Sequence, residues 1–381
     1  MEYASIEVVE EQSPDEVFVE FWEAPYDVVT ITPEPHECRK ERNRCIGHHM
    51  DRTMLVRAWR AFARGKSRRA DVQEFAFNLE TNLEELYHEL HGQTYVHGPY
   101  RMFTRCDPKP RRIAVSSVRD QIVHQLVINA LGQTFERSFH PHSYASRPGK
   151  GVLVAAETVH GWIAQCSDGG RQRCWALRMD VRSFFASVDH ATLMALVRRR
   201  VPGSWMWLCE RIVRSFGTEH ADRRIGLPLG NVTSQLFANT YLHELDRFVA
   251  HELHARRYAR YMDDWVIIGR DRAGLEHMAE RCRVFLAEAL RLEAPASKTW
   301  IAPVHRGVDW LGFVLFPHHR ILRSSTMHRM RSRIRSRVFA SLDEGLPYDR
   351  LRSIFASYDG LLRHGAHGRE RDRLLTLQQC C

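Results

Sequence analysis

The sequence predicts an α+β fold with a buried core. Short apolar runs bounded by turn residues alternate with segments whose apolar residues recur at helical spacing. The clearest helical segments are residues 50–64, 71–91 and 273–292. Two short apolar runs flank the adjacent acids Asp263 and Asp264, which predicts a hairpin with both acids at or beside its turn. With 381 residues, 44% of them hydrophobic, the chain has room for two or three lobes.

The charge of the chain is strongly asymmetric. Eleven of its 46 acids lie in residues 1–37, which hold no Lys or Arg, so residues 38–381 carry 55 basic and 35 acidic side chains, a net charge of +20. Arg, whose planar guanidinium suits phosphate and base contacts, predominates over Lys. A nucleic-acid partner is the favoured explanation, and solubility or Arg-rich codon usage is the alternative. One hypothesis is that the acidic extension mimics nucleic acid over a basic groove.

Other classes of protein are not indicated. Nine cysteines contain no Cys-x-x-Cys pair, so neither a zinc site nor a disulfide framework is expected. No apolar run approaches the length of a membrane span, and the N-terminus is too acidic for a signal peptide, so no membrane partner is expected. The expected setting is the reducing cytoplasm.

A basic strand and a glycine-lysine turn occupy the first half of the chain. Residues 107–115 are predicted to form a strand with Lys109, Arg111 and Ile113 on one face and Arg112 on the other. An ordinary charged edge strand is the alternative. The turn at residues 143–151 lacks the spacing of a phosphate-binding P-loop, although Lys150 and its backbone donors could meet a phosphate. Asp71 is expected to cap the helix of residues 71–91.

Three acids lie at the ends of apolar strands, and they suggest a metal site. Asp180 follows the apolar run of residues 174–179, and Asp263 and Asp264 follow residues 258–262. A strand-helix-strand-strand order can place all three at one end of a sheet. Clustered carboxylates beside Arg and Lys suit two Mg²⁺ ions and phosphoryl transfer. Taken alone, the Asp-Asp pair is more often a solvated surface turn, and Asp180 a helix cap.

Three further segments complete the pattern. The Gly230-Asn231 turn, which leads into a helix carrying Gln235, is interpreted as the edge of a site because glycine allows close approach to the backbone. Residues 307–316 are predicted to form another hairpin. In the C-terminal tail, Arg329, Arg333 and Arg337 lie beside an apolar stripe on one helix, formed by Met330, Ile334, Val338 and Leu342. Phosphate contact by these arginines competes with a merely solvated face.

In order along the chain, these motifs resemble the seven sequence blocks of reverse transcriptases. The resemblance covers residues 95–320 and is closest to bacterial enzymes of the group II intron-like assemblage, nearest those of diversity-generating retroelements. The residues that carry it are Arg111, Arg119-Asp120, Ser143-Tyr144, Gly149-Lys150-Gly151, Met179-Asp180, Phe184-Phe185, Leu227-Pro228-Leu229-Gly230-Asn231, Ser234-Gln235, Tyr261-Met262-Asp263-Asp264, Lys298 and Trp310-Leu311-Gly312-Phe313.

The resemblance implies a right-hand polymerase with fingers, a ferredoxin-like palm sheet and a short helical thumb. It also implies an RNA template, a DNA or RNA primer, dNTPs and two Mg²⁺ ions (or Mn²⁺), with a small accessory protein as a candidate partner. The implied divisions are an acidic extension (1–45), fingers (46–172), palm (173–320) and thumb with tail (321–381).

The resemblance also assigns roles to individual residues. Asp180 and Asp263 would be the chief metal ligands, Asp264 would assist, and Lys298 would lie near the leaving pyrophosphate. The nucleotide site would comprise Lys109, Arg111, Phe185, Gly230, Asn231 and Gln235, with Phe185 stacking under the sugar. Primer and template contacts would come from Lys150, Trp310, Gly312, Arg329, Arg333 and Arg337.

Two departures from the family pattern bear on copying. Leu229 and Gln235 stand where many reverse transcriptases carry Gln and Pro. Both positions would lie near the templating base pair, so error-prone copying is expected. An anti-phage defence enzyme, whether template-directed, template-independent or protein-primed, is the alternative role. A non-catalytic RNA-binding scaffold is a weaker alternative, because the acids, Phe185 and Lys298 are all present.

Overall fold

The computed structural model describes residues 50–106, 110–344 and 348–380, with side chains left out at 340–344, 348–351 and 377–380. The chain divides into two units, Met1–Arg44 and Cys45–Cys381, and every described residue belongs to the second. The acidic extension, the proposed mimicry of nucleic acid and Lys109 therefore lie outside the described residues.

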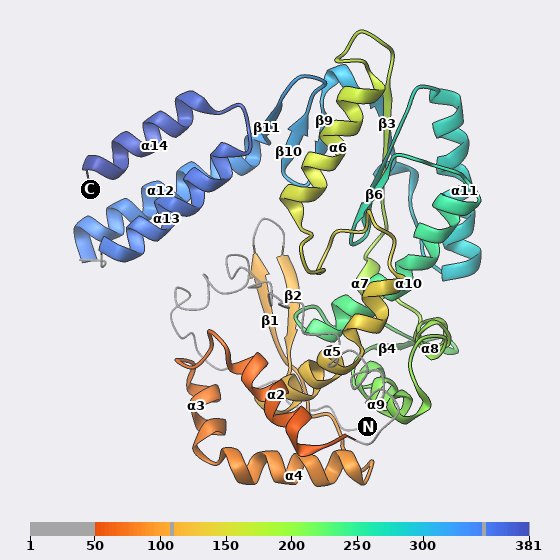
Figure 1. Cartoon of the computed structure of the whole chain (residues 1–381), viewed down its shortest axis with the longest axis vertical. Coiled ribbons are helices and arrows are strands. Elements are labelled where there is room, and N and C mark those ends of the chain that lie inside the picture. Colours follow the sequence, from red (N-terminus) through yellow and green to blue (C-terminus); the bar gives the residue numbers. More distant parts are fainter. Residues whose placement is uncertain (1–49, 107–109, 345–347, 381) are drawn as a thin grey trace, which may run out of the picture. The chain divides into compact units, whose positions relative to one another are not determined.

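A four-stranded antiparallel sheet carries the strands that end in acids (Figure 1). Its strand order is β6-β7-β3-β8, and the bounds are Trp175–Asp180 for β3, Tyr258–Tyr261 for β6, Asp264–Gly269 for β7 and Trp300–Pro303 for β8. Helix α10 (Val232–His251) precedes β6, and α11 (Arg272–Leu290) joins β7 to β8. This order of strands and helices is the ferredoxin-like arrangement that the sequence analysis expected.

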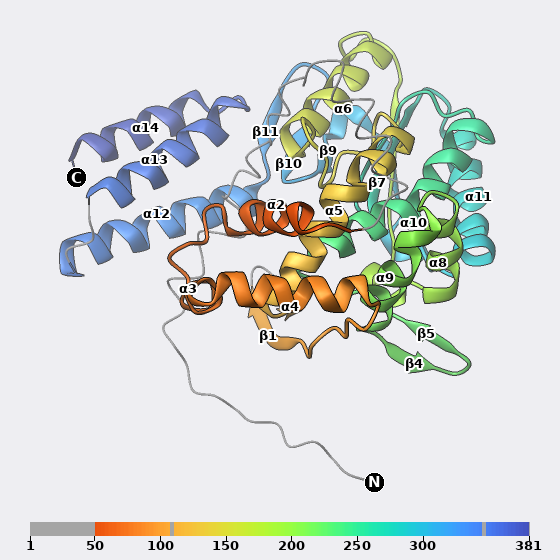
Figure 2. The same cartoon turned by 60° about the horizontal axis from the view of Figure 1, so that its bottom comes forward.

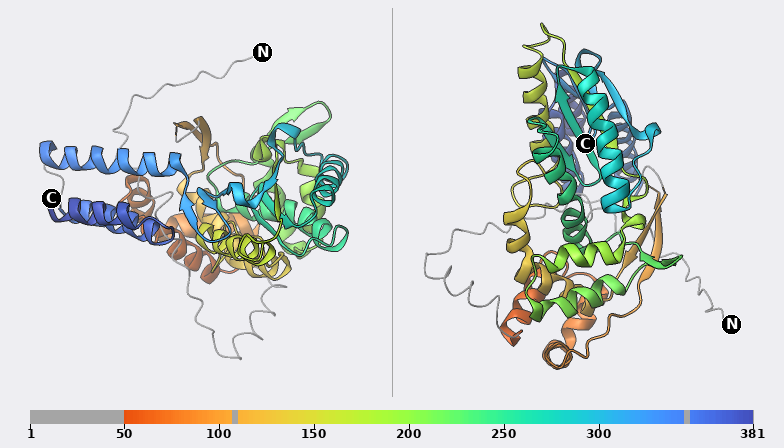
Figure 3. Two further views of the ribbon diagram at one scale, coloured as in Figure 1. Left: turned by 90° about the horizontal axis from the view of Figure 1, so that it is seen from above. Right: turned by 90° about the vertical axis from the view of Figure 1, so that its right-hand side faces the viewer.

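Alternation along β7 places apolar side chains on both faces of the sheet. Trp265 and Ile267 join a core formed with α10 and α11, whereas Val266 and Ile268 join a second core. The second core includes α6 (Val152–Cys166), which lies on the opposite face of the sheet from α11 (Figures 1 and 3). With both faces covered, polar chemistry is confined to the end of the sheet.

The N-terminal helices are α2 (Arg52–Ala63), α3 (Ala70–Phe77) and α4 (Leu79–His91). Of these, α2 and α3 pack against α5 (Val118–Ser138), which begins after the cap residue Ser117, and α4 packs against α2 and α3 (Figure 2). The single helix predicted for residues 71–91 is wrong, because the chain breaks at Asn78 between two helices. Nor does Asp71 cap a helix, since it lies in the first turn and pairs with Arg69.

The predicted basic strand exists, and it pairs with a second strand that was not predicted from the sequence. Strand β2 (Pro110–Val115) pairs with β1 (Arg101–Cys106) in an antiparallel hairpin. The elements between β3 and α10 in the chain are α7 (Phe184–Ser187), α8 (His190–Arg198), α9 (Gly203–Arg214), β4 (Thr218–His220) and β5 (Arg223–Ile225).

The C-terminal part combines a small sheet with three helices (Figure 3). Met330 and Ile334 are buried along α12 as the apolar stripe predicted, and the side chain of Leu342 lies outside the described residues. The elements are the 3-10 helices η1 (Ala296–Lys298) and η2 (Val304–Arg306), strands β9 (Val308–Trp310), β10 (Phe313–Leu315) and β11 (Arg320–Leu322), and helices α12 (Ser324–Glu344), α13 (Tyr348–Arg363) and α14 (Gly368–Cys380). Across the described ranges, no helix is both long and apolar enough to span a membrane.

Candidate active site

The two adjacent acids lie at a tight turn between β6 and β7. Tyr261 pairs with Asp264 across the two-residue connection Met262-Asp263. Met262 adopts a left-handed conformation with φ of 52°, which costs a residue other than glycine about 1–2 kcal/mol. On the neighbouring strand β3, Asp180 is the register partner of Asp264. The predicted convergence of the three acids at one end of the sheet is therefore confirmed.

Lys298 contacts the first of these acids. Its Nζ donates to Asp180 Oδ1 at 2.9 Å and to the carbonyl of Val181 at 2.9 Å. Lys298 ends the single turn η1, which follows the loop after α11. The ammonium of Lys298 thus partly balances the negative charge at the end of β3. Its expected position near the leaving pyrophosphate stays a prediction.

Asp264 has a different partner. Arg178 donates from Nε and Nη2 to its two carboxylate oxygens at 2.9 and 2.7 Å, and from Nη1 to the carbonyl of Asp309 at 2.7 Å. Burial raises the pKa of Asp264, and the Arg178 guanidinium opposes that rise. Asp264 therefore ties the sheet to strand β9 through Arg178.

Asp263 is half-buried close to the carboxylate of Asp180. Burial, followed by the negative charge of Asp180, raises its pKa to about 6. Its backbone carbonyl accepts from the amide of Val181 at 3.3 Å, which fixes the turn against β3. A carboxylate held near another carboxylate is stabilised by a cation, so Asp180 and Asp263 suit a divalent metal.

A complete metal cage is not preformed. Within residues 50–106, 110–344 and 348–380, no three Asp, Glu, His or Cys side chains are grouped closely enough to hold an ion. Both oxygens of Asp264 are engaged by Arg178, and one oxygen of Asp180 is engaged by Lys298. Asp180 and Asp263 are the donors that fit best, and the assisting role of Asp264 stays a prediction.

The Gly230 turn docks directly on strand β2. Its φ is 122°, and a Cβ there would lie 3.0 Å from the carbonyl oxygen of Ala114. The amide of Ala114 donates to the carbonyl of Leu229 at 2.8 Å, and Ser116 Oγ donates to Asn231 Oδ1 at 3.1 Å. The close approach expected at Gly230 is thus to the strand that bears Arg111. Asn231 is buried and holds this turn in place.

Other predicted nucleotide contacts lie around the same region. Arg111 is exposed on β2, and Arg112 is equally exposed, so burial does not distinguish them. Phe185 is half-buried and packs edge to face on Phe184, with ring centroids 5.4 Å apart. The carbonyl of Phe185 accepts from the amide of Leu227 at 2.6 Å. Gln235 accepts a hydrogen bond from the hydroxyl of Ser146.

The predicted primer and template residues have mixed placements. Lys150 donates to the carbonyl of Pro141 at 3.0 Å and lies over the ring of Tyr144. Gly312 has a φ of 84° at the β9–β10 turn. Arg333 is exposed on α12, and Arg329 and Arg337 are half-buried on the same helix.

Trp310, in the hairpin predicted to contact the primer, is not open to solvent. Its side chain is fully buried, in the same apolar core as Val308 and Phe313. Large apolar surface is stabilised by removal from water, and here the ring supports the hairpin from within. A contact to primer from this hairpin would have to come from its backbone or from other side chains.

Several site residues went unrecognised in the sequence. Arg178 lies two positions before Asp180, so strand alternation already places it on the face of that acid. Arg260 lies within an apolar strand, where a charged residue signals a buried partner. That partner, Asp246, is on α10 and could not be paired from spacing alone.

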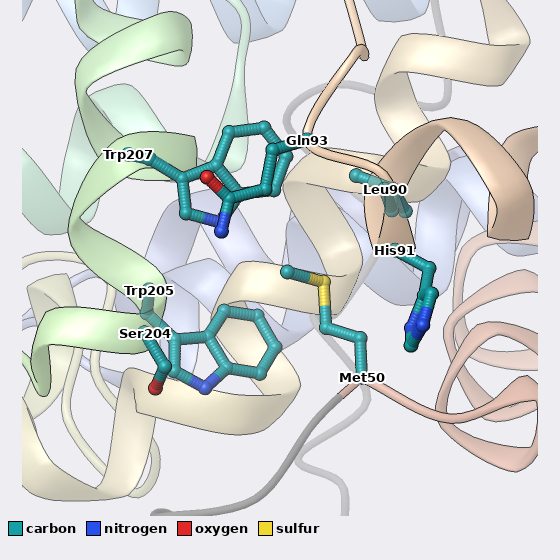
Figure 4. A pocket seen from close by; sticks show the side chains of 7 residues that line it. All are labelled: Met50, Leu90, His91, Gln93, Ser204, Trp205 and Trp207. Carbon is teal, nitrogen blue, oxygen red and sulfur yellow. The ribbon is translucent and has the colours of Figure 1, made fainter.

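A separate pocket lies between α4 and α9. Its volume is about 100 Å³, and no predicted site residue lines it (Figure 4). The lining residues are Met50, Leu90, His91, Gln93, Ser204, Trp205 and Trp207.

Comparison with known proteins agrees with the geometry of the acids. The family described as "Reverse transcriptase (RNA-dependent DNA polymerase)" matches residues 106–315. Protein YkfC of Escherichia coli (strain K12) is 29% identical over 326 residues, 74% of this chain and 80% of YkfC. Group II intron-encoded protein LtrA of Lactococcus lactis subsp. cremoris is 21% identical over 322 residues, 66% of this chain. The match covers 51% of LtrA, so the chain spans about half the length of that relative.

Among solved structures, apo telomerase from Candida tropicalis superposes with a TM-score of 0.45 and 9% identity, over 60% of this chain and 55% of that one. The family match is the decisive finding, because it covers more than half of the chain and includes Asp180, Asp263, Asp264 and Lys298. Its limits also enclose the whole four-stranded sheet. The chain, which has an α+β fold, belongs to the reverse transcriptases, which are RNA-directed DNA polymerases.

Proposed function

We propose that this chain copies RNA into DNA by adding dNTPs to the 3′-hydroxyl of a DNA or RNA primer. The observation that carries the proposal is the convergence of Asp180 and Asp263 at one end of the sheet, with Lys298 bound to Asp180. Mg²⁺ is the proposed cofactor, as two ions, with Mn²⁺ as a substitute. Such ions would activate the attacking hydroxyl and stabilise the leaving pyrophosphate.

The residues of the chain divide this work. Asp180 and Asp263 hold the metal, and Asp264 supports them while Arg178 fixes its orientation. Lys298, beside Asp180, supplies positive charge where pyrophosphate leaves and is the candidate proton donor there. The dissociation of pyrophosphate develops negative charge, so a nearby ammonium lowers the barrier electrostatically.

Backbone contacts join the parts of the proposed nucleotide site to one another, from Leu227 to Phe185 and from Ala114 to Leu229. Arg111 binds the triphosphate from β2, and the Gly230 turn closes against the same strand. Phe185 lies under the sugar and excludes a 2′-hydroxyl, supported by its packing on Phe184. Gln235 lies at the template side, fixed by Ser146.

Primer extension on a defined RNA template with a DNA primer, dNTPs and Mg²⁺ tests this activity. Asp263→Ala, alone and combined with Asp264→Ala, should abolish incorporation, since loss of a metal-binding carboxylate removes several kcal/mol of transition-state stabilisation. Binding of the primer–template by either variant should remain close to wild type. Incorporation that survives in both variants would refute the assignment of the site. A wild-type protein that binds RNA but extends no primer would favour the non-catalytic scaffold.

The biological setting that we propose is a diversity-generating retroelement, with a small accessory protein as partner. The block from Gly230 to Gln235 supports it, because this block carries the resemblance to that branch. Leu229 and Gln235 also support it, since they depart from the usual family pattern near the expected templating base pair. A neighbouring pair of variable repeats would support this setting, and isolation among defence genes would favour an anti-phage enzyme instead. Sequencing the nucleic acid that copurifies with the wild type and with the double variant would identify template, product and priming site. Products without a template match, or attached to protein, would indicate template-independent or protein-primed synthesis.

A further inference from the structure

A buried ion pair lies directly behind the catalytic turn. Arg260, on β6, and Asp246, on α10, both have fully buried side chains. The guanidinium donates from Nε and Nη2 to the two carboxylate oxygens of Asp246, each at 2.6 Å. Burial acts to raise the pKa of Asp246, but the charge of Arg260 and the hydrogen bonds to the carboxylate together outweigh burial and hold that pKa below its ordinary value. Both groups are therefore charged in the folded protein.

Every N–H donor of Arg260 has a partner, and the partners lie on α10, at the turn and in the loop at Ser143. Besides Asp246, Nη1 donates to Asn239 Oδ1 at 3.2 Å and to the carbonyl of Met262 at 2.9 Å, and Nη2 donates to Ser143 Oγ at 3.0 Å. A guanidinium has five N–H donors in a fixed planar fork, and here all five are used. The fork thereby sets the mutual geometry of β6, α10 and the loop at Ser143.

The bond to Met262 reaches the catalytic turn itself. Met262 is the left-handed residue that precedes Asp263, and such a conformation persists only where its surroundings hold it. On its other side, the turn is held by the bond from the Val181 amide to the Asp263 carbonyl. Loss of the Arg260 bond would release one of the hydrogen bonds that hold the backbone of the turn bearing Asp263.

The same network extends to the loop after residue 142. Asn239 Nδ2 donates to the carbonyl of Ala145 at 2.8 Å, and Ser143 forms an isolated parallel bridge with Arg260. Ser146, which follows Ala145 in the chain, donates a hydrogen bond from its hydroxyl to Gln235. The buried side chain of Arg260 and its partner Asn239 thus connect the turn that bears the acids with the loop that contacts Gln235.

We infer that Arg260, oriented by Asp246, is the positioning residue that holds the Met262-Asp263 turn in its catalytic geometry and fixes it to the Ser143–Ser146 loop. This inference rests on the proposed polymerase function. A buried ion pair is weak evidence for stability, because apolar replacements of similar volume are often as stable. All five donors of Arg260 are satisfied and one of them binds the turn, so the geometry indicates that Arg260 orients the turn.

Arg260→Lys is the first test variant, because it retains the charge but cannot reach four partners with one ammonium. Turnover in primer extension should fall by about 10- to 100-fold, as expected for misplacement of a reacting group by about 1 Å. The KM for primer–template should change less than about twofold, since no nucleic-acid contact is removed. All variants are compared at a temperature where each is folded.

Tyr241→Phe is the matched control. Tyr241 is fully buried on the same helix as Asp246, and its hydroxyl donates to the carbonyl of Leu290 at 2.7 Å, a bond that does not include the turn. This variant should lose thermal stability and keep its turnover. If Arg260→Lys fails to fold, Ser143→Ala removes a single acceptor of the fork and should lower turnover by several-fold with nearly native stability.

Two measurements separate this inference from the polymerase assignment. Amide hydrogen exchange of residues 258–268 should accelerate in Arg260→Lys and stay unchanged in Tyr241→Phe. Binding of Mn²⁺ to the protein, followed by electron paramagnetic resonance, should weaken in Arg260→Lys. Both readouts hold even if the wild type extends no primer. Arg260→Lys with native turnover, exchange and Mn²⁺ binding would overturn the inference and leave the ion pair a merely stabilising feature.

Discussion

Asp263 and Asp264 are neighbours in sequence but have different surroundings. Asp263 has a raised pKa because it is buried near Asp180, whereas both oxygens of Asp264 are held by Arg178. The turn produces this division, since it directs successive side chains to different partners. The carboxylate that lacks a bidentate arginine is the better metal donor, which supports Asp263 as the chief ligand and Asp264 as its support.

His124 is a second residue whose surroundings determine its charge. It is buried on α5, where its Nε2 lies 3.1 Å from His97 Nε2 and its Nδ1 lies 2.6 Å from Thr233 Oγ1. Burial, then the nearby His97, lowers the pKa of His124 to about 3. The contact with Thr233 joins α5 to the helix that follows the Gly230 turn.

The depressed pKa of His124 predicts a loss of stability in acid. Below pH 6.5 the unfolded chain binds a proton at this residue and the folded chain does not, so stability falls as the pH drops from about 6.5 to about 3. At pH 4.5 this contribution amounts to about 2–3 kcal/mol. Urea unfolding of His124→Leu between pH 7 and pH 4.5 should show a shallower decline than wild type. The exposed His277 on α11 offers the control, and a His277→Asn profile should follow wild type; equal slopes for all three proteins would contradict the prediction.

At the scale of elements, the Gly230 turn depends on close packing against β2. The left-handed backbone of Gly230 and the short distance to the carbonyl of Ala114 leave no room for a side chain. This contact joins the start of α10 to the strand carrying Arg111, so it sets the relation between two predicted parts of the nucleotide site.

Gly230→Ala should therefore destabilise the protein by about 1–3 kcal/mol and reduce nucleotide incorporation. The added Cβ would meet the backbone of Ala114 at 3.0 Å, which forces the turn away from β2. Denaturant unfolding and the KM for dNTP measure the two effects.

Gly161→Ala on α6 is the control for this substitution. A Cβ at Gly161 meets nothing within 4 Å, and alanine favours a helix by about 0.8–1 kcal/mol over glycine. This variant should be as stable as wild type or more so, with unchanged dNTP kinetics. A Gly230→Ala protein that behaves like Gly161→Ala would show that the turn is free to adapt.

At the scale of the whole molecule, charge is the dominant feature. Residues 38–381 carry a net charge of +20. Exposed arginines lie on the β1–β2 hairpin at Arg101, Arg111 and Arg112, and Arg333 is exposed on α12. Phosphate contacts by such side chains release counterions, so affinity for nucleic acid should fall steeply with salt.

The contribution of α12 to this effect is measurable from salt dependence. Arg333→Gln should reduce the slope of log affinity against log salt by about 0.7–0.9, the amount expected for one phosphate contact. Fluorescence anisotropy with an RNA–DNA primer–template at several salt concentrations provides the slope. Arg214→Gln is the control, because Arg214 is exposed on α9 and pairs with Glu210. Equal slopes for the two variants would mean that Arg333 makes no specific phosphate contact.

Local sequence patterns predicted much of this structure. Short apolar runs ending in Asp180 and Asp263 predicted strands β3 and β6, because burial on both faces of a sheet demands continuous apolar residues. Gly230 predicted a close approach to its backbone, since only glycine tolerates both the space and the conformation there. The family resemblance added the expected ferredoxin-like sheet, which the strand order confirms.

The misses have a common cause, which is dependence on distant residues. Strand β1 is exposed along nearly its whole length and exists through its pairing with β2, so its own pattern is weak. The break at Asn78 accompanies a bond from Asn82 Nδ2 to the carbonyl of Phe75, and helical spacing continues across it. Trp310 belongs to the hairpin predicted to contact the primer, but the fold places its ring in the core.

By itself, the sequence predicted which residues would carry the chemistry: three acids at strand ends, a lysine, a glycine turn and an excess of arginine. These depend on local periodicity and residue type, which are readable in one dimension. Only the tertiary structure decided which carboxylate remains available and what holds the catalytic turn. Arg178, Arg260 and Asp246 reach their partners across strands and helices, 86 positions away in the case of Arg178 and Asp264. Such contacts arise when the sheet forms and its faces are buried, so no local pattern contains them.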